Sequence, residues 1–230
     1  MLNEDEAQFL EMDTQWCAAV SRVQVERSAL SAWEDHFSDM CSEHDELLQN
    51  GRWVAGSDDL LTIIRRARHE AYHSALLAWL LNPVGKHGLG ISLLKSLLAH
   101  AGVNQVPDLH LARPALEVQR ADTRADIVVF APGCTIVLEN KVNAGEQPRQ
   151  CDRLVERFGA DPGAVFIFLT PTGRAPLTAT GLALTLWHTI GYETLFSMLT
   201  EALRTVAAPA SLAGRATAEN YLATLRREFT

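Results

Sequence analysis

The sequence of 230 residues lacks several features that would assign it to a familiar class of proteins. It has only four cysteines and no C-x-x-C pair, which argues against a zinc knuckle and a thioredoxin-type redox site. Its most apolar stretch, residues 75–81, is too short to span a bilayer. The acidic start lacks the basic and then apolar order of a signal peptide. We therefore expect a cytoplasmic protein with free thiols and no membrane segment.

Positive charge and nucleotide-binding motifs are also scarce. Lysine and arginine number 20 against 28 aspartates and glutamates, so the formal net charge is −8. Proteins that wrap nucleic acid by bulk electrostatics are usually basic, so any such contact here needs a local basic patch, metal ions or a partner. There is no glycine-rich phosphate loop, which argues against an ATP-driven motor in this chain.

Ordinary globular composition is present, with 47 % hydrophobic and 21 % charged residues. No glycine or proline interrupts residues 3–50, and Asn50-Gly51 is a typical helix stop. Apolar residues in this segment recur at spacings of three, four or seven, which predicts helix. They are Phe9, Trp16, Val20, Val23, Leu30, Trp33, Phe37, Met40 and Leu47. We predict an N-terminal helical hairpin, residues 1–56, whose apolar stripe suits a homodimer or protein partner, followed by a second domain, residues 57–230.

The second domain changes its pattern along the chain. Residues 57–82 and 89–101 are expected to form helices. Strands are expected at residues 115–118, 125–131, 135–142 and 164–170, with a further candidate at 182–187. Helices are expected again at residues 146–158, 190–204 and 215–229. A strand hairpin followed by a strand–helix–strand crossover predicts an α/β fold with a mixed β-sheet flanked by helices.

Two acids and a lysine are brought together by the predicted hairpin. Side chains two apart on a strand share a face, so Glu139 and Lys141 project together and Asn140 points the other way. Asp126 begins the preceding strand, and the turn at Pro132-Gly133 places it opposite the end of the next strand. Because the surrounding residues are apolar, these charges must be paired or bind a metal. Carboxylate oxygens suit Mg²⁺ or Mn²⁺.

These residues resemble a known family. The pattern Asp126…Glu139-Asn140-Lys141 is similar to the motif of the PD-(D/E)xK nucleases, which share a restriction-endonuclease-like fold. An uncharacterised bacterial and phage branch also carries a glutamate, His-Ser, Leu-Leu-Asn-Pro and His-Gly upstream. The corresponding residues here are Glu70, His73-Ser74, Leu80-Leu81-Asn82-Pro83 and His87-Gly88. The resemblance covers residues 68–170 and implies a metal-dependent nuclease that hydrolyses phosphodiester bonds, in DNA rather than RNA.

The resemblance also implies roles for individual residues. Asp126 and Glu139 would bind Mg²⁺ or Mn²⁺ together with the backbone carbonyl of Asn140. Glu70 would be an additional, water-mediated metal ligand.

The remaining site residues follow from the same resemblance. Lys141 would act on the attacking water. Gln150 would correspond to the glutamine that borders the site in RecB-like members, with Gln147 as its rival. An alternative is a catalytically silent binding or assembly module that retains this fold.

A second motif competes with this interpretation. His69-Glu70-Ala71-Tyr72-His73 reads H-E-x-x-H, the helical zinc site of many metalloproteases. The extended form of that motif would need Gly at position 76 and His at 79, where Leu76 and Trp79 stand. We therefore keep the zinc protease as a minor alternative. His73 is as consistent with a site border as with an ordinary helix residue.

Overall fold

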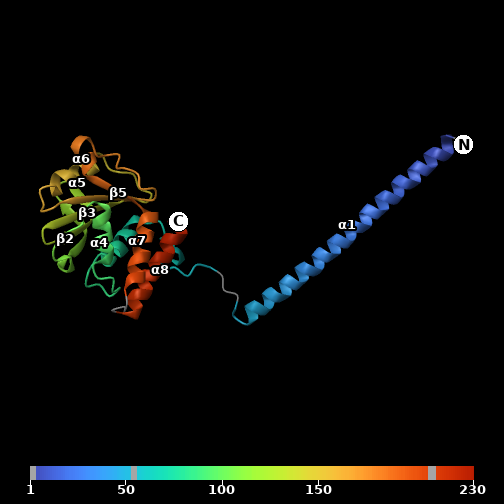
Figure 1. Ribbon diagram of the computed structural model, residues 1–230, viewed down its shortest axis with the longest axis horizontal. Helices are drawn as coiled ribbons and strands as arrows, with labels where there is room; N and C mark the ends of the chain where they lie inside the picture. Colours follow the sequence, from blue (N-terminus) through green and yellow to red (C-terminus); the bar gives the residue numbers. More distant parts are fainter. Residues whose placement is uncertain (1–3, 53–55, 207–210) are drawn as a thin grey trace. The chain divides into compact units, whose positions relative to one another are not determined.

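The computed structural model describes residues 4–52, 56–206 and 211–230, with side chains from residue 11 onward. The chain divides into two compact units, Met1–Gly56 and Ser57–Thr230. Figure 1 labels many of the helices and strands of the two units.

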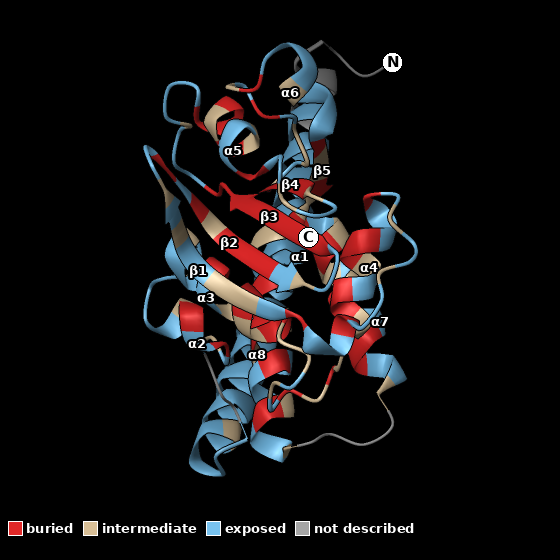
Figure 2. Cartoon of the chain, turned by 90° about the vertical axis from the view of Figure 1, so that its left-hand side faces the viewer, coloured by how far each residue is buried: buried red, intermediate tan, exposed pale blue. Residues whose placement is uncertain are grey.

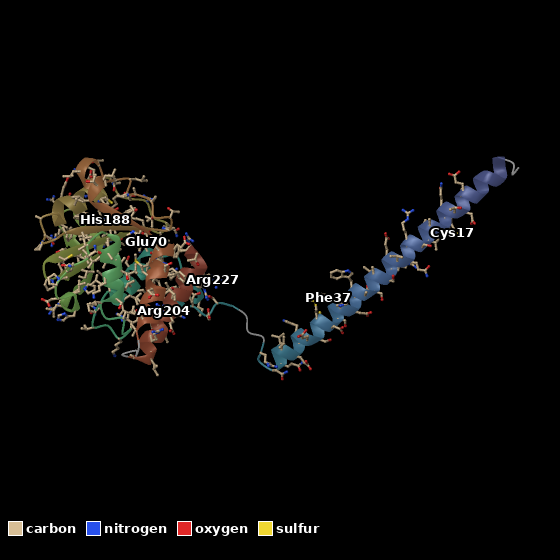
Figure 3. The ribbon with its side chains drawn as sticks, viewed as in Figure 1. Cys17, Phe37, Glu70, His188, Arg204 and Arg227 are labelled. Atoms are coloured by element: carbon tan, nitrogen blue, oxygen red, sulfur yellow. The ribbon has the colours of Figure 1, made fainter. Side chains whose placement is uncertain are left out.

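The first unit consists of one uninterrupted helix, α1, from Glu4 to Gln49. The predicted helical hairpin is therefore wrong, although the helical character is confirmed. A hairpin needs residues that break the helix, and no glycine or proline precedes Gly51. The predicted stop is confirmed: Gly51 has φ 61°, and Arg52 N donates to Leu47 O at 2.8 Å, which closes the helix as a Schellman motif. Figure 3 shows the side chain of Phe37 projecting from this helix.

The second unit is built on a five-stranded mixed sheet in the order β1-β2-β3-β4-β5. Its strands are β1 (Arg113–Arg120), β2 (Thr123–Ala131), β3 (Cys134–Asn140), β4 (Val165–Thr170) and β5 (Trp187–Gly191). The first three strands are antiparallel neighbours, whereas β3, β4 and β5 run parallel. The crossovers pass through helices, as parallel strands require. The predicted α/β architecture with a mixed sheet is thus confirmed.

Helices cover both faces of this sheet. The helical elements of this unit are α2 (Leu60–Ile63), α3 (Glu70–Leu80), α4 (Ser92–His100), η1 (Leu109–Leu111), α5 (Gln150–Phe158), α6 (Gly181–Leu186), α7 (Tyr192–Thr205) and α8 (Leu212–Phe229). One core joins α3, α4, α7 and α8 to Ile127 and Leu138, while a second joins α5 to Val128 and Val137. Successive strand residues face opposite cores, which explains why β3 is buried along its whole length (Figure 2).

The fifth strand lies five residues later than predicted. Leu182, Leu184 and Leu186 alternate with smaller residues and suggested a strand, but they belong to α6 and remain exposed. The strand that pairs with β4 begins at Trp187, which is buried against Phe166 and Phe168. The alternation of these leucines with smaller residues is therefore not the pattern of a strand with one buried face. Along the described parts of the chain, no helix combines the length and apolar character needed to cross a membrane.

Candidate active site

The site lies at the open end of the β2–β3 hairpin. Ala131 pairs with Cys134, so Pro132 and Gly133 alone form the turn, and Gly133 adopts φ 71°, a value that suits glycine. The antiparallel register runs to the pair Ile127–Leu138. Asp126 and Glu139 stand one step beyond that pair, on neighbouring strands.

Short contacts tie the acids and the lysine to one another. Lys141 Nζ lies 2.6 Å from Glu139 Oε1. Gln150 Nε2, at the start of α5, donates to the same Glu139 oxygen at 2.5 Å. Asp126 Oδ2 accepts a hydrogen bond from the Asn140 backbone N–H at 2.8 Å. The fold thus brings Asp126, Glu139, Lys141 and Gln150 into one cluster.

Burial makes this cluster electrostatically unusual. The Glu139 side chain is fully buried, and burial followed by the neighbouring Asp126 carboxylate raises the pKa of Glu139 to about 8. Burial also raises the pKa of Asp126. Burial alone would lower the pKa of Lys141, but the Glu139 and Asp126 carboxylates outweigh it and raise that pKa. The carboxylates of Asp126 and Glu139 repel each other, and the single ammonium of Lys141 offsets only part of this repulsion. A further positive charge at this site would therefore stabilise the two ionised acids.

Glu70 reaches the same region from the first turn of α3. Its Oε1 accepts three backbone N–H bonds, from Val142 at 2.7 Å, Asn143 at 3.0 Å and Ala144 at 2.8 Å. Glu70 therefore holds the segment that follows Lys141, and it lines one cleft with Asp126, Lys141 and other residues. Sequence reasoning placed Glu70 beside the acids but gave no indication of these backbone contacts.

Asn140 points to the opposite face of the sheet, as the two-residue period predicts. Its Nδ2 donates to Ser74 Oγ at 3.1 Å and to Glu70 O at 3.3 Å. Its Oδ1 accepts from Tyr192 Oη at 2.8 Å. Asn140 thereby joins β3 to α3 and α7. Nothing in the sequence pattern indicated Tyr192, because this contact arises only from the packing of α7.

A divalent cation fits the donors at this site. Glu139 Oε2 is buried without a hydrogen-bond partner, and a buried carboxylate oxygen of this kind needs a cation or a proton. Among the described residues, no group of three or more His, Cys, Asp or Glu side chains is arranged to hold a metal ion. The oxygen donors that the structure brings together here are the carboxylates of Asp126 and Glu139 on neighbouring strands. Such a sparse set of oxygens is typical of Mg²⁺, which keeps several waters.

A cleft of about 470 Å³ opens onto Asp126, Lys141 and Glu70, whereas Glu139 is fully buried and does not line it. Arg124, next to Asp126 in β2, lines it together with Gln147 and Gln150. Gln147 is exposed, whereas Gln150 is buried and contacts Glu139, so Gln150 is the glutamine that borders the acids.

Glu117 lies opposite Asp126 on β1 but does not join the cluster. Its backbone adopts φ 50°, and its side chain, 59 % exposed, lies 3.5 Å from Arg124. This pair is exposed on both sides and therefore weak. The other arginines near the site are paired with acids: Arg120 with Asp161, Arg149 with Glu156, and Arg153 and Arg157 with Asp122.

The zinc-protease alternative receives no support from this geometry. His69 precedes α3 as its N-cap, and His73 is fully buried. Both ring nitrogens of His73 are already engaged, with Tyr221 Oη at 2.9 Å and Ala67 O at 2.8 Å. His73 is therefore a core residue rather than a metal ligand or a site border.

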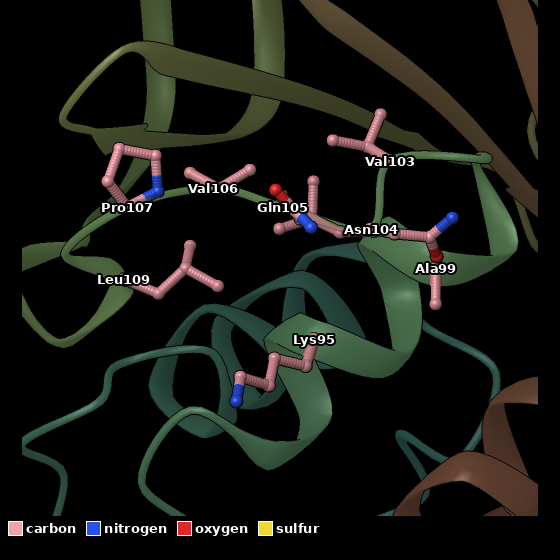
Figure 4. A pocket seen from close by; sticks show the side chains of 9 residues that line it. Lys95, Ala99, Val103, Asn104, Gln105, Val106, Pro107 and Leu109 are labelled. Carbon is pink, nitrogen blue, oxygen red and sulfur yellow. The ribbon is translucent and has the colours of Figure 1, made fainter.

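A second cleft, of about 640 Å³, lies between α4 and the segment that follows it (Figure 4). Lys95 is its one ionisable lining residue, and Leu98, Val103, Val106 and Leu109 contribute apolar surface. Its lining contains no Asp, Glu, His or Cys, so the cluster of acids lies at the other cleft.

Comparison with known proteins identifies the family of the chain. A family model described as the PD-(D/E)XK nuclease superfamily matches residues 58–229. No curated protein and no solved structure matches the chain significantly. The match covers three quarters of the chain and spans every residue of the carboxylate cluster. The chain therefore belongs to the PD-(D/E)XK nuclease superfamily.

Proposed function

We propose that this chain is a metal-dependent nuclease that hydrolyses phosphodiester bonds in DNA. The observation that carries the proposal is the cluster of Asp126, Glu139 and Lys141 at the end of a hairpin that is otherwise apolar. Asp126 and Lys141 line the cleft, and Glu139 is buried in contact with Lys141. Membership of the nuclease superfamily supports the same reaction.

In the proposed mechanism, Asp126 and Glu139 would hold Mg²⁺ or Mn²⁺ with the backbone carbonyl of Asn140, and Glu70 would be an additional ligand. A bound divalent ion would supply Lewis acidity and a more acidic water. The ammonium of Lys141, 2.6 Å from Glu139 Oε1, is positioned to orient the attacking water and to stabilise negative charge on the phosphate. Gln150 fixes the orientation of the Glu139 carboxylate through its 2.5 Å hydrogen bond.

Local charge accounts for substrate binding despite the net charge of −8. Arg124 lies on the cleft, and its weak pair with Glu117 can be exchanged for a phosphate oxygen. A bound divalent ion would offset the negative charge of the two acids.

Lys141→Ala tests this proposal. We expect wild type to cleave plasmid or linear DNA with Mg²⁺ or Mn²⁺, and EDTA to abolish cleavage. Lys141→Ala should lower the cleavage rate by about 10²–10⁴-fold, the usual contribution of a group that acts on the attacking water. Lys95→Ala, which replaces an exposed lysine in the other cleft, is the matched control and should retain full activity.

Two outcomes would contradict the proposal. One is the absence of cleavage of single- and double-stranded DNA by wild type with either metal. Binding of DNA without cleavage would then indicate a catalytically silent binding module. Cleavage of RNA but not of DNA would show that the substrate is RNA. The other is equal activity of Lys141→Ala and wild type.

A further inference from the structure

The helix α1 carries an apolar seam that no other described helix can cover along its length. At 46 residues and 1.5 Å per residue, α1 is about 69 Å long. The next longest helix, α8, has 18 residues and measures about 27 Å. The large side chains of α1 are exposed, among them Trp16 at 71 %, Trp33 at 76 % and Phe37 at 66 %. Monomeric proteins seldom expose so large an apolar surface.

The seam follows a seven-residue period. Two positions of each heptad form it: one contains Trp16, Val23, Leu30 and Phe37, and the other contains Ala19, Glu26, Trp33 and Met40. A strict spacing of 3.5 residues over several turns requires another helix that winds around the first, because a straight helix drifts away from this period. A flat domain surface does not impose such a repeat. The occupant is therefore a helix of similar length and period.

The side chains of the seam are complementary to those of a second α1 that runs in the opposite direction. When two copies of α1 are aligned antiparallel so that facing residue numbers sum to 56, large residues meet small or flexible ones. The facing pairs are Trp16 with Met40, Ala19 with Phe37, Val23 with Trp33, and Glu26 with Leu30. A parallel alignment would instead place Trp33 against Trp33, Ala19 against Ala19 and Glu26 against Glu26. In the parallel alignment, some facing pairs would consist of two large side chains and others of two small ones. The two Glu26 carboxylates would also face each other and repel.

We propose that α1 pairs with α1 of a second copy of this chain as an antiparallel two-stranded coiled coil, with Val23 facing the partner's Trp33. Each copy contributes Trp16, Trp33 and Phe37, and aromatic side chains bury about 150–250 Å² each, so these residues alone bury about 1,000 Å² in the pair. That area reaches the range of specific interfaces. The pairing is independent of the proposed catalysis, since it uses no residue of the cleft.

Oligomeric state measured on the full chain tests the pairing. Light scattering coupled to size exclusion, without nucleic acid and at high salt, should give twice the chain mass of 25.3 kDa. Val23→Glu with Leu30→Glu places two charges on the seam one heptad apart and should yield monomer. Val25→Glu with Ala32→Glu is the matched control, because these exposed residues lie one heptad apart off the seam, and it should remain dimeric.

Disulfide cross-linking tests the orientation. In a Cys17→Ser, Cys41→Ser background, which removes the exposed thiols, Val23→Cys combined with Trp33→Cys should give a cross-linked dimer under mild oxidation. Either substitution alone should not.

Several outcomes would overturn the proposal. Monomeric wild type would mean that α1 folds back on its own chain or awaits another protein, and a trimer or tetramer would exclude a two-stranded coil. A dimer that survives both seam charges would form elsewhere. Efficient cross-linking by Val23→Cys alone would indicate a parallel pair.

Discussion

Arg124 stands beside Asp126 with its guanidinium 3.5 Å from Glu117 and 59 % of its side chain exposed. If it contacts a phosphate, Arg124→Ala should weaken DNA binding about fivefold, equivalent to about 1 kcal/mol, with little change in the maximal rate. The slope of log affinity against log salt should fall by about one. Fluorescence anisotropy across a salt series, with Ca²⁺ in place of Mg²⁺ to suppress cleavage, measures both.

Arg204→Ala is the control for this experiment. Arg204 also pairs with an acid, Glu201 at 2.8 Å, but it lies on α7 and lines neither cleft described above. We expect its affinity and salt slope to match those of wild type. Equal losses in both variants would show that Arg124 acts only through general charge.

Individual site residues differ in how far the sequence predicts their positions. Glu139, Lys141 and Asp126 follow from the two-residue period of a strand and from a turn of two residues, both of which are local. The bonds of Glu70 to three backbone N–H groups depend on the conformation of residues 142–144, which no periodicity encodes. The contact of Gln150 with Glu139 depends on how α5 packs against the sheet.

At the scale of elements, a buried hydrogen bond between Tyr192 and Asn140 links α7 to β3. Tyr192→Phe removes the donor to Asn140 Oδ1, which is then left buried without a partner, so the free energy of unfolding should fall by about 1–2 kcal/mol. Urea denaturation followed by tryptophan fluorescence measures this loss. Tyr72→Phe, at a 40 % exposed position on α3, should change stability by less than about 0.5 kcal/mol. Equal free energies of unfolding for the two variants would show that the hydrogen bond between Tyr192 and Asn140 does not stabilise the fold.

The elements that the sequence predicts best are those with a dense pattern. The strands β2, β3 and β4 are continuous apolar runs between turn residues, and all were expected close to their observed bounds. The failures have two causes. The fifth strand was misplaced because exposed leucines of α6 imitate strand alternation. The predicted hairpin is wrong because residues 4–49 contain no glycine or proline that would end a helix between them.

At the scale of the whole second unit, Ser57–Thr230, Asp59 links the first residues of the unit to its last helix, α8. Its carboxylate accepts hydrogen bonds from Ser57 Oγ at 2.6 Å, Thr224 Oγ1 at 2.7 Å and Thr62 N at 3.0 Å. Burial raises the pKa of Asp59, but these hydrogen bonds outweigh it and lower the pKa from 3.8 to about 2. Folding therefore favours the ionised carboxylate of Asp59, and its ionisation adds to the free energy of unfolding.

This linkage predicts a pH-dependent loss in Asp59→Asn. Because the folded pKa is the lower one, the stabilisation is fully present above about pH 4 and disappears as the pH falls through about 2. Asp59→Asn should lose about 2 kcal/mol at pH 7 and much less near pH 2, measured by urea unfolding at both values. Asp58→Asn changes the same charge at an exposed neighbour and should have little effect. A loss that is equal at both pH values would exclude ionisation as its cause.

The compactness of the β2–β3 hairpin has an evolutionary consequence. The span from Asp126 to Lys141 is only 16 residues long and contains Asp126, Glu139 and Lys141. Their spacing is set by one register and one two-residue turn, so distant insertions or fusions need not disturb it. Such a cassette can be inherited almost intact while the surrounding chain diverges.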